Sequence, residues 1–148
     1  MGIGNTLRGD DGFGPALIER LNQPQRAESG LKRKIKAVCL DAGSAPENFT
    51  GKIVKEKPDT ILIVDALHLG LSPGEYEILK KDEIAKSGFS THNISLHMFI
   101  EYLENQTKAD IYLLGVQPKN ISFGEEISDS VKKTLEGILK IVTEISNA

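Results

Sequence analysis

The sequence contains a single cysteine, Cys39, among its 148 residues, and it contains no tryptophan. One thiol cannot form an internal disulfide, and it cannot supply the cysteine pairs that structural zinc sites use. Because Cys39 lies within a short apolar run, we expect it to be a thiol of the hydrophobic core. Disulfide scaffolds and cysteine-rich metal domains are therefore excluded.

An excess of positive charge is also missing. The chain has 18 Lys and Arg against 21 Asp and Glu, which gives a net charge of -3. A dedicated nucleic-acid binder carries a dense basic face, whereas the basic cluster at residues 32–34 fits a solvated loop edge. We therefore expect no nucleic-acid partner.

Long apolar segments are absent as well. No stretch approaches the roughly 18 apolar residues of a membrane-spanning helix. Residues 1–6 lack the charged region and the apolar run of a signal peptide. We therefore expect no membrane insertion and a cytoplasmic location. With 39% hydrophobic and 26% charged residues, the composition is that of an ordinary globular protein, so we expect one domain over residues 1–148 and a monomer.

Short apolar runs alternate with amphipathic stretches, a pattern typical of α/β proteins. The run at residues 60–64 is continuous and rich in β-branched side chains, which predicts a central strand buried on both faces. Residues 75–79 alternate in polarity after a Pro-Gly turn and predict an edge strand, which can run antiparallel. Further strands are predicted at residues 1–4, 36–40 and 110–115.

Helices are predicted at residues 15–21, 46–57 and 95–106, and a further helix near the end of the chain has the clearest pattern. Its apolar residues recur every three or four positions, which predicts a stripe that packs flat against the sheet. The stripe consists of Val131, Leu135, Ile138, Val142 and Ile145. Helices placed between strands predict crossover connections between parallel strands.

Residues 2–15 join the first predicted strand to the first predicted helix and contain five glycines and two adjacent acids, Asp10 and Asp11. Such junctions often hold the sites of α/β proteins. A dinucleotide-binding loop is one interpretation, but Leu7 stands at the third glycine position and the two acids would repel an anion. The alternative is a tight turn whose glycines permit positive φ and whose acids are solvated or cap the helix.

Acids also follow two other predicted strands. Asp65 comes directly after the central strand, and Asp41 comes directly after residues 36–40. The carboxyl ends of parallel strands meet at one edge of a sheet, where open α/β proteins bind their ligands. Asp65 is therefore either a turn or helix cap, or part of a shared cleft with Asp11.

A metal site in this cleft needs a softer ligand beside the carboxylates, and the sequence offers three histidines. His92 is the preferred candidate, because it lies in a polar segment from which its ring nitrogens are free to reach the cleft. His97 lies among apolar residues of a predicted helix and fits a packing role, whereas His68, close to Asp65, is a reserve candidate. Two carboxylates and one imidazole suit nickel, zinc or another borderline divalent ion.

Taken together, these motifs resemble those of a known family. The segment Gly-Ile-Gly-Asn-Thr-Leu-Arg-Gly-Asp-Asp-Gly-Phe-Gly-Pro is similar to the opening signature of the hydrogenase maturation proteases. Five further motifs follow in that family's order, at residues 41–48, 63–66, 70–75, 90–93 and 114–118. Ser-Ala-Pro-Glu-Asn and Thr-His-Asn resemble the subgroup that processes formate-hydrogenlyase-type and related nickel-iron hydrogenases. The similarity extends from residue 1 to about residue 140.

The resemblance implies a fold, an activity and a site. The fold is a three-layer α/β arrangement, with a twisted, mainly parallel five-stranded sheet flanked by helices on both faces. The activity is that of a nickel-dependent endopeptidase, which removes a carboxyl-terminal extension from the nickel-loaded precursor of a nickel-iron hydrogenase large subunit. Nickel is expected to be supplied by the metal centre of the substrate. The family's metal-contacting residues correspond to Asp11, Asp65 and His92, and the two acids are the catalytic candidates.

One alternative function and one division of roles stay open at the level of sequence. A non-catalytic chaperone that recognises the nickel-loaded precursor would use the same three residues, so only product formation separates it from a protease. The roles of base and metal contact are not divided between Asp11 and Asp65. Members of the family usually have several apolar residues before the Gly-x-Gly-Asn motif, whereas only Met-Gly-Ile precedes Gly4 here, so we expect a short first strand.

Overall fold

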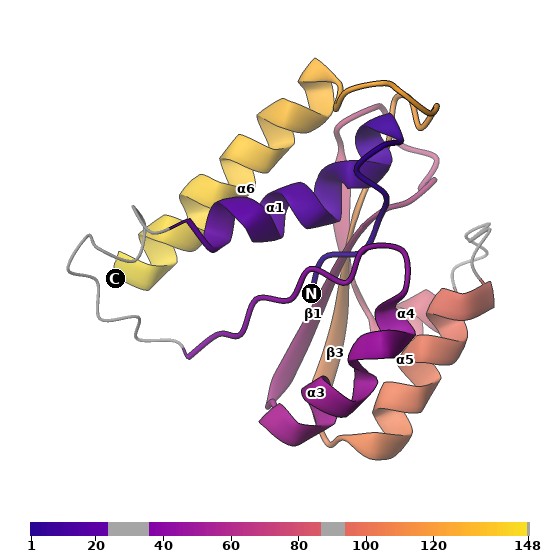
Figure 1. Cartoon of the computed structure of the whole chain (residues 1–148), viewed down its shortest axis with the longest axis vertical. Helices are drawn as coiled ribbons and strands as arrows, with labels where there is room; N and C mark the ends of the chain where they lie inside the picture. Colours follow the sequence, from indigo (N-terminus) through magenta and orange to yellow (C-terminus); the bar gives the residue numbers. More distant parts are fainter. Residues whose placement is uncertain (24–35, 87–93, 148) are drawn as a thin grey trace.

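The computed structural model describes residues 1–23, 36–86 and 94–147. Helices cover both faces of a central sheet, as Figure 1 shows, so the predicted α/β class is confirmed. The strands are β1 (Thr60–Ala66), β2 (Tyr76–Lys80) and β3 (Asp110–Val116), in the spatial order β1-β3-β2. β1 runs parallel to β3, and β2 runs antiparallel to β3.

Two further segments continue the sheet beyond β1 through backbone hydrogen bonds. Gly2 forms isolated parallel bridges with Val64 and Asp41. The N–H of Ile3 donates to the carbonyl of Val64 at 2.8 Å, and the N–H of Gly2 donates to the carbonyl of Leu40 at 2.8 Å. The order of segments across this edge is therefore residues 40–42, residues 1–4 and then β1.

The predicted five-stranded, mainly parallel sheet is not confirmed, because the described residues form a three-stranded mixed sheet. Residues 1–4 make two isolated bridges, both at Gly2, and residues 40–42 make one, at Asp41, since the chain turns away at Gly4, where φ is 141°. Residues 36–40 form no strand, and only the end of that segment reaches the sheet. Cys39 is half-buried, so the prediction that it is a core thiol is wrong.

The helices confirm the four predicted segments and add two that the sequence pattern does not show. In chain order they are the 3-10 helix η1 (Gly9–Gly12), α1 (Phe13–Leu21), the 3-10 helix η2 (Pro46–Phe49), α3 (Thr50–Glu56), α4 (Lys81–Lys86), α5 (Ile94–Gln106) and α6 (Asp129–Asn147). η1 and α4 were not predicted, because segments this short have no full helical period to recognise. None of the helices in the described residues combines the length and the apolar composition needed to cross a membrane.

α1 and α6 lie on one face of the sheet (Figure 1), and α6 carries the predicted apolar stripe. Its first members, Val131, Leu135 and Ile138, are buried with the side chains of α1 and one face of β1 and β3. Val142 and Ile145 are exposed. The stripe is therefore confirmed over the first turns of α6, whereas the last turns do not bury it.

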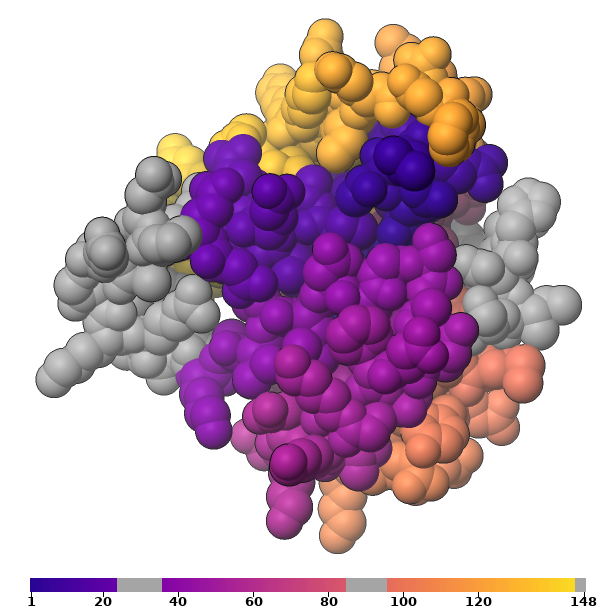
Figure 2. Space-filling view, viewed as in Figure 1, coloured from indigo at the N-terminus to yellow at the C-terminus, as the bar shows by residue number. Residues whose placement is uncertain are grey.

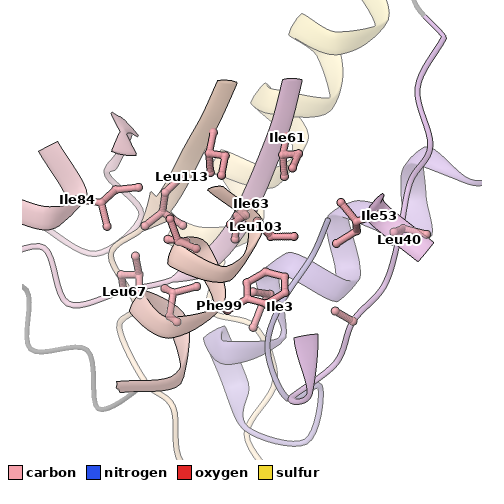
Figure 3. Packing of buried hydrophobic residues seen from close by; sticks show 14 residues of the cluster. Ile3, Leu40, Ile53, Ile61, Ile63, Leu67, Ile84, Phe99, Leu103 and Leu113 are labelled. Carbon is pink, nitrogen blue, oxygen red and sulfur yellow. The ribbon is translucent and has the colours of Figure 1, made fainter. Parts of the chain in front are cut away.

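α3, α4 and α5 cover the opposite face, where the larger core cluster lies. Figure 3 shows Phe99 and Leu103 of α5 packed beside Ile61 and Ile63 of β1. Side chains alternate between the two faces of a strand, so the residue two positions after Ile63 points to the same side of the sheet. That residue is Asp65, at the carboxyl end of β1.

Candidate active site

Asp65 is a buried acid near the carboxyl end of β1, with only 4% of its surface exposed. Its carboxylate accepts one hydrogen bond among the described residues, from the N–H of Ala66 to Oδ1 at 2.8 Å. No ion pair to Asp65 is formed in the part of the chain that the structure describes. Burial raises the pKa of Asp65 well above its ordinary value, the charge of Asp11 raises it further, and the N–H of Ala66 acts in the opposite direction.

Asp11 lies in η1, and its side chain closes the glycine-rich loop. Oδ2 of Asp11 accepts a hydrogen bond from the N–H of Asn5 at 2.9 Å. The carbonyl of Asn5 accepts the N–H of Arg8, and the carbonyl of Arg8 accepts the N–H of Asp11, both at 3.1 Å. A Cβ on Gly4 would lie 1.8 Å from the carbonyl oxygen of Asp11, so only glycine allows the strand end to approach η1 this closely.

Asp11 and Asp65 line the same hollow, which has a volume of about 200 Å³. The segments around it come from the start of the chain, from the turn before η2 and from α5. The other lining residues are Ile3, Gly4, Asn5, Arg8, Ser44, Pro46 and Leu96. In Figure 2 the indigo surface of the first loop borders the magenta surface of the segment that contains η2 and α3. The structure therefore brings the two predicted acids together, whereas exposed Asp41 is not among the lining residues.

His92, the third predicted site residue, lies outside the described residues. His68 is exposed on the segment after β1, and His97 is half-buried on α5. Neither is among the described residues that line the hollow. Within residues 1–23, 36–86 and 94–147, no three His, Cys, Asp or Glu side chains group together to hold a metal ion. Among the described residues that line the hollow, the carboxylates of Asp11 and Asp65 are the groups that could bind a cation.

Asp10 has a different environment from its neighbour. It is fully buried, and its carboxylate accepts hydrogen bonds from the N–H groups of Lys119, Asn120 and Ser128 at 2.7 to 3.1 Å. The hydroxyl of Ser128 donates a further hydrogen bond, at 2.9 Å. Asp10 therefore fastens η1 to the segment that precedes α6, while Asp11 faces the hollow. The sequence alone did not show which of the two acids caps or fastens the loop and which belongs to the site. Adjacent acids have the same chemistry, and only the folded backbone determines the direction in which each side chain points.

Arg8 lines the hollow but was not predicted as a site residue. Its Nε donates a hydrogen bond to the carbonyl of Ile121 at 3.2 Å. Within the described part of the chain, no carboxylate oxygen lies within 4.0 Å of its guanidinium nitrogens. The sequence signal for Arg8 is weak, since it consists of one cation in the same loop as Asp11.

Comparisons with known proteins agree on one family. Residues 15–145 match the family model described as hydrogenase maturation protease. The hydrogenase 3 maturation protease of Escherichia coli K12 is 34% identical over 137 residues, which cover 92% of this chain and 82% of that protein. The crystal structure of HycI, a NiFe hydrogenase maturation protease from Thermococcus kodakarensis, has a TM-score of 0.80 at 35% identity and covers 99% of this chain and 90% of its own. The solution structure of the endopeptidase HycI from Escherichia coli has a TM-score of 0.79 at 34% identity. The match covers 97% of this chain and 86% of that protein.

Proposed function

This chain belongs to the hydrogenase maturation protease family and is of the HycI type, and from that premise we propose that it removes the carboxyl-terminal extension from the precursor of a nickel-iron hydrogenase large subunit. Relatives are named as proteases and endopeptidases, so the chemistry is hydrolysis of a peptide bond. The observation that carries the proposal is the pair of carboxylates, Asp11 and Asp65, in one hollow.

The carboxylate pair supports general acid–base catalysis. Two like charges close together cannot both ionise without cost, and burial adds to the cost at Asp65. An acid whose pKa lies above its ordinary value can take a proton from an attacking water and return it to the departing amine. The direction of the shift therefore favours Asp65 as the proton acceptor in the proposed reaction.

The nickel in this proposal belongs to the metal centre of the substrate. A divalent cation near Asp11 and Asp65 would offset both the mutual repulsion of the carboxylates and the cost of burying Asp65. Oxygen ligands with one imidazole suit a borderline ion such as nickel, and His92 remains the predicted source of that imidazole. Contact with nickel would delay cleavage until the precursor is loaded. The cytoplasmic location and the monomeric state also remain predictions.

The proposal is tested by incubating the purified protein with a large-subunit precursor, either nickel-loaded or nickel-free, followed by mass spectrometry of the precursor's carboxyl terminus. We expect one defined peptide to be lost, and only from the loaded precursor. Asp65→Asn should not cleave. Asp41→Asn is the matched control, because Asp41 is an exposed acid that does not line the hollow and whose Oδ1 also accepts one backbone N–H, from Gly43 at 3.0 Å.

Each remaining outcome has a definite meaning. Equal cleavage of loaded and nickel-free precursor would show that the reaction does not depend on nickel. Binding of the loaded precursor without release of a peptide would contradict the protease proposal and support the chaperone alternative.

A further inference from the structure

Arg8 is an exposed cation that lines the same hollow as the two acids, and it forms no ion pair with the residues that the structure describes. Arg8, Asp11 and Asp65 all line this space. No ion pair of 4.0 Å or shorter joins the guanidinium to either carboxylate. Opposite charges that share a hollow without contact leave room for a polar group of a ligand between them. The charge of Arg8 is therefore available to a bound substrate.

The backbone of Arg8 is fixed within the loop, and its exposed side chain makes one hydrogen bond to the described residues. Its N–H donates to the carbonyl of Asn5, and its own carbonyl accepts the N–H of Asp11. Nε donates to the carbonyl of Ile121, and the four terminal guanidinium donors make no hydrogen bond to the described part of the chain. The loop that carries Ile121 is in turn fastened by Asp10. A cation positioned before the substrate arrives needs little reorganisation during the reaction.

We propose that Arg8 is a catalytic residue that donates hydrogen bonds to the carbonyl oxygen of the scissile peptide bond, an inference that depends on the proposed function. In the reaction, a water oxygen forms a bond to the carbonyl carbon while a carboxylate of the acid pair takes the water proton. The electron pair of the C=O bond moves to the oxygen, which becomes the oxyanion facing Arg8. The C–N bond then breaks, the oxyanion returns its electron pair to the carbonyl, and the departing nitrogen takes the proton from the carboxylic acid.

The charge arrangement favours this role over simple attraction of an acidic substrate group. The carbonyl oxygen gains negative charge in the transition state, so a guanidinium beside it binds the transition state more strongly than the substrate. The acids repel that oxyanion, so it belongs on the Arg8 side of the hollow and the attacking water on the acid side. Arg8 should therefore affect the rate of cleavage much more than the affinity for the precursor.

The test measures two quantities for wild type and Arg8→Met with nickel-loaded precursor, namely the single-turnover rate of peptide release and the dissociation constant of the complex. Removal of one oxyanion donor lowers a rate about 100-fold to 1,000-fold. We expect a loss of about this size in rate and a change of less than about threefold in affinity. Arg8→Gln is the second variant, because its amide can still donate to the carbonyl of Ile121 without a charge, and it should show the same separation of rate from affinity.

Arg20→Met is the matched control, since Arg20 forms an ion pair with Glu136 on the surface of α1 and α6. It should cleave at the wild-type rate. The inference is overturned if Arg8→Met and Arg8→Gln cleave within about threefold of wild type, or if the loss of affinity accounts for the loss of rate. A wild-type protein that releases no peptide would instead refute the proposed function, so the two failures are distinguishable.

Discussion

Replacement of Asp65 by asparagine is expected to stabilise the protein at neutral pH while abolishing cleavage. Asp65 is 4% exposed, and its carboxylate accepts one hydrogen bond from the described residues, from the adjacent N–H of Ala66. An asparagine keeps that acceptor, cannot ionise and can donate an N–H toward Asp11. Sites arranged for chemistry commonly reduce stability in this way.

The expected gain depends on pH. The pKa of Asp65 is raised in the folded protein, by burial first and by Asp11 second, so the folded state keeps this proton to higher pH than the unfolded chain does. Wherever the folded state binds more protons, the free energy of unfolding falls as pH rises. The loss of stability that Asp65 causes is therefore absent at pH values below the pKa of Asp65 in the unfolded chain. It grows between the unfolded and the folded pKa of Asp65, and it is complete above the folded pKa.

The size of the gain follows from the cost of burying a polar group with too few partners, about 1–3 kcal/mol. For a protein of 148 residues, each kcal/mol shifts the melting temperature by about 2–4 °C. Asp65→Asn should therefore melt about 2–12 °C above wild type at pH 8, and the difference should shrink steadily toward pH 4.

Urea unfolding and thermal melts across this pH range provide the assay, with Asp41→Asn as the control. Asp41 is exposed, so its replacement should stay within about 0.5 kcal/mol of wild type at each pH. The reasoning is refuted if Asp65→Asn is less stable than wild type at pH 8, or if its gain is the same at pH 5 and pH 8.

Three other substitutions test the glycine-rich loop. Asp11→Asn should stop peptide release with little change in melting temperature, because asparagine can still accept the N–H of Asn5; full cleavage would remove Asp11 from the mechanism. Asp10→Asn should lower the free energy of unfolding by about 2 kcal/mol or more, measured in urea, because an amide nitrogen cannot accept the N–H groups and hydroxyl that the carboxylate binds; wild-type stability would contradict this. Gly4→Ala should lower the free energy of unfolding by about 3 kcal/mol or more, measured in thermal melts, since its Cβ would lie 1.8 Å from the carbonyl oxygen of Asp11. Gly51→Ala on α3 is the control, because its Cβ would meet no atom within 4 Å, and it should raise the free energy of unfolding by up to about 1 kcal/mol.

The sequence predicted the elements whose patterns are long and regular. β1 was visible as a continuous apolar run, and α6 was visible as a helical stripe, because burial on one or two faces imposes a period on the residues. The position of Asp65 followed from the same pattern, since it is the first acid after the predicted run at residues 60–64, although in the structure β1 extends through Asp65 to Ala66. The family resemblance then singled out Asp11 and Asp65, and the comparisons confirm that family.

Strand pairing and the surroundings of the site residues were decided by tertiary structure, because the local sequence pattern carries no information on contacts between distant segments. The four-residue segment at the start of the chain forms its bridges on both sides at Gly2, so the number of strands depends on contacts between distant segments rather than on propensity. Asp10 and Asp11 are identical in type and adjacent in sequence, yet one is fully buried beneath residues 119–128 and the other faces the hollow. The environment of Arg8 likewise depends on Ile121, more than a hundred residues away. Burial, charge pairing and pKa are properties of what surrounds a side chain, and those surroundings exist only once the chain has folded.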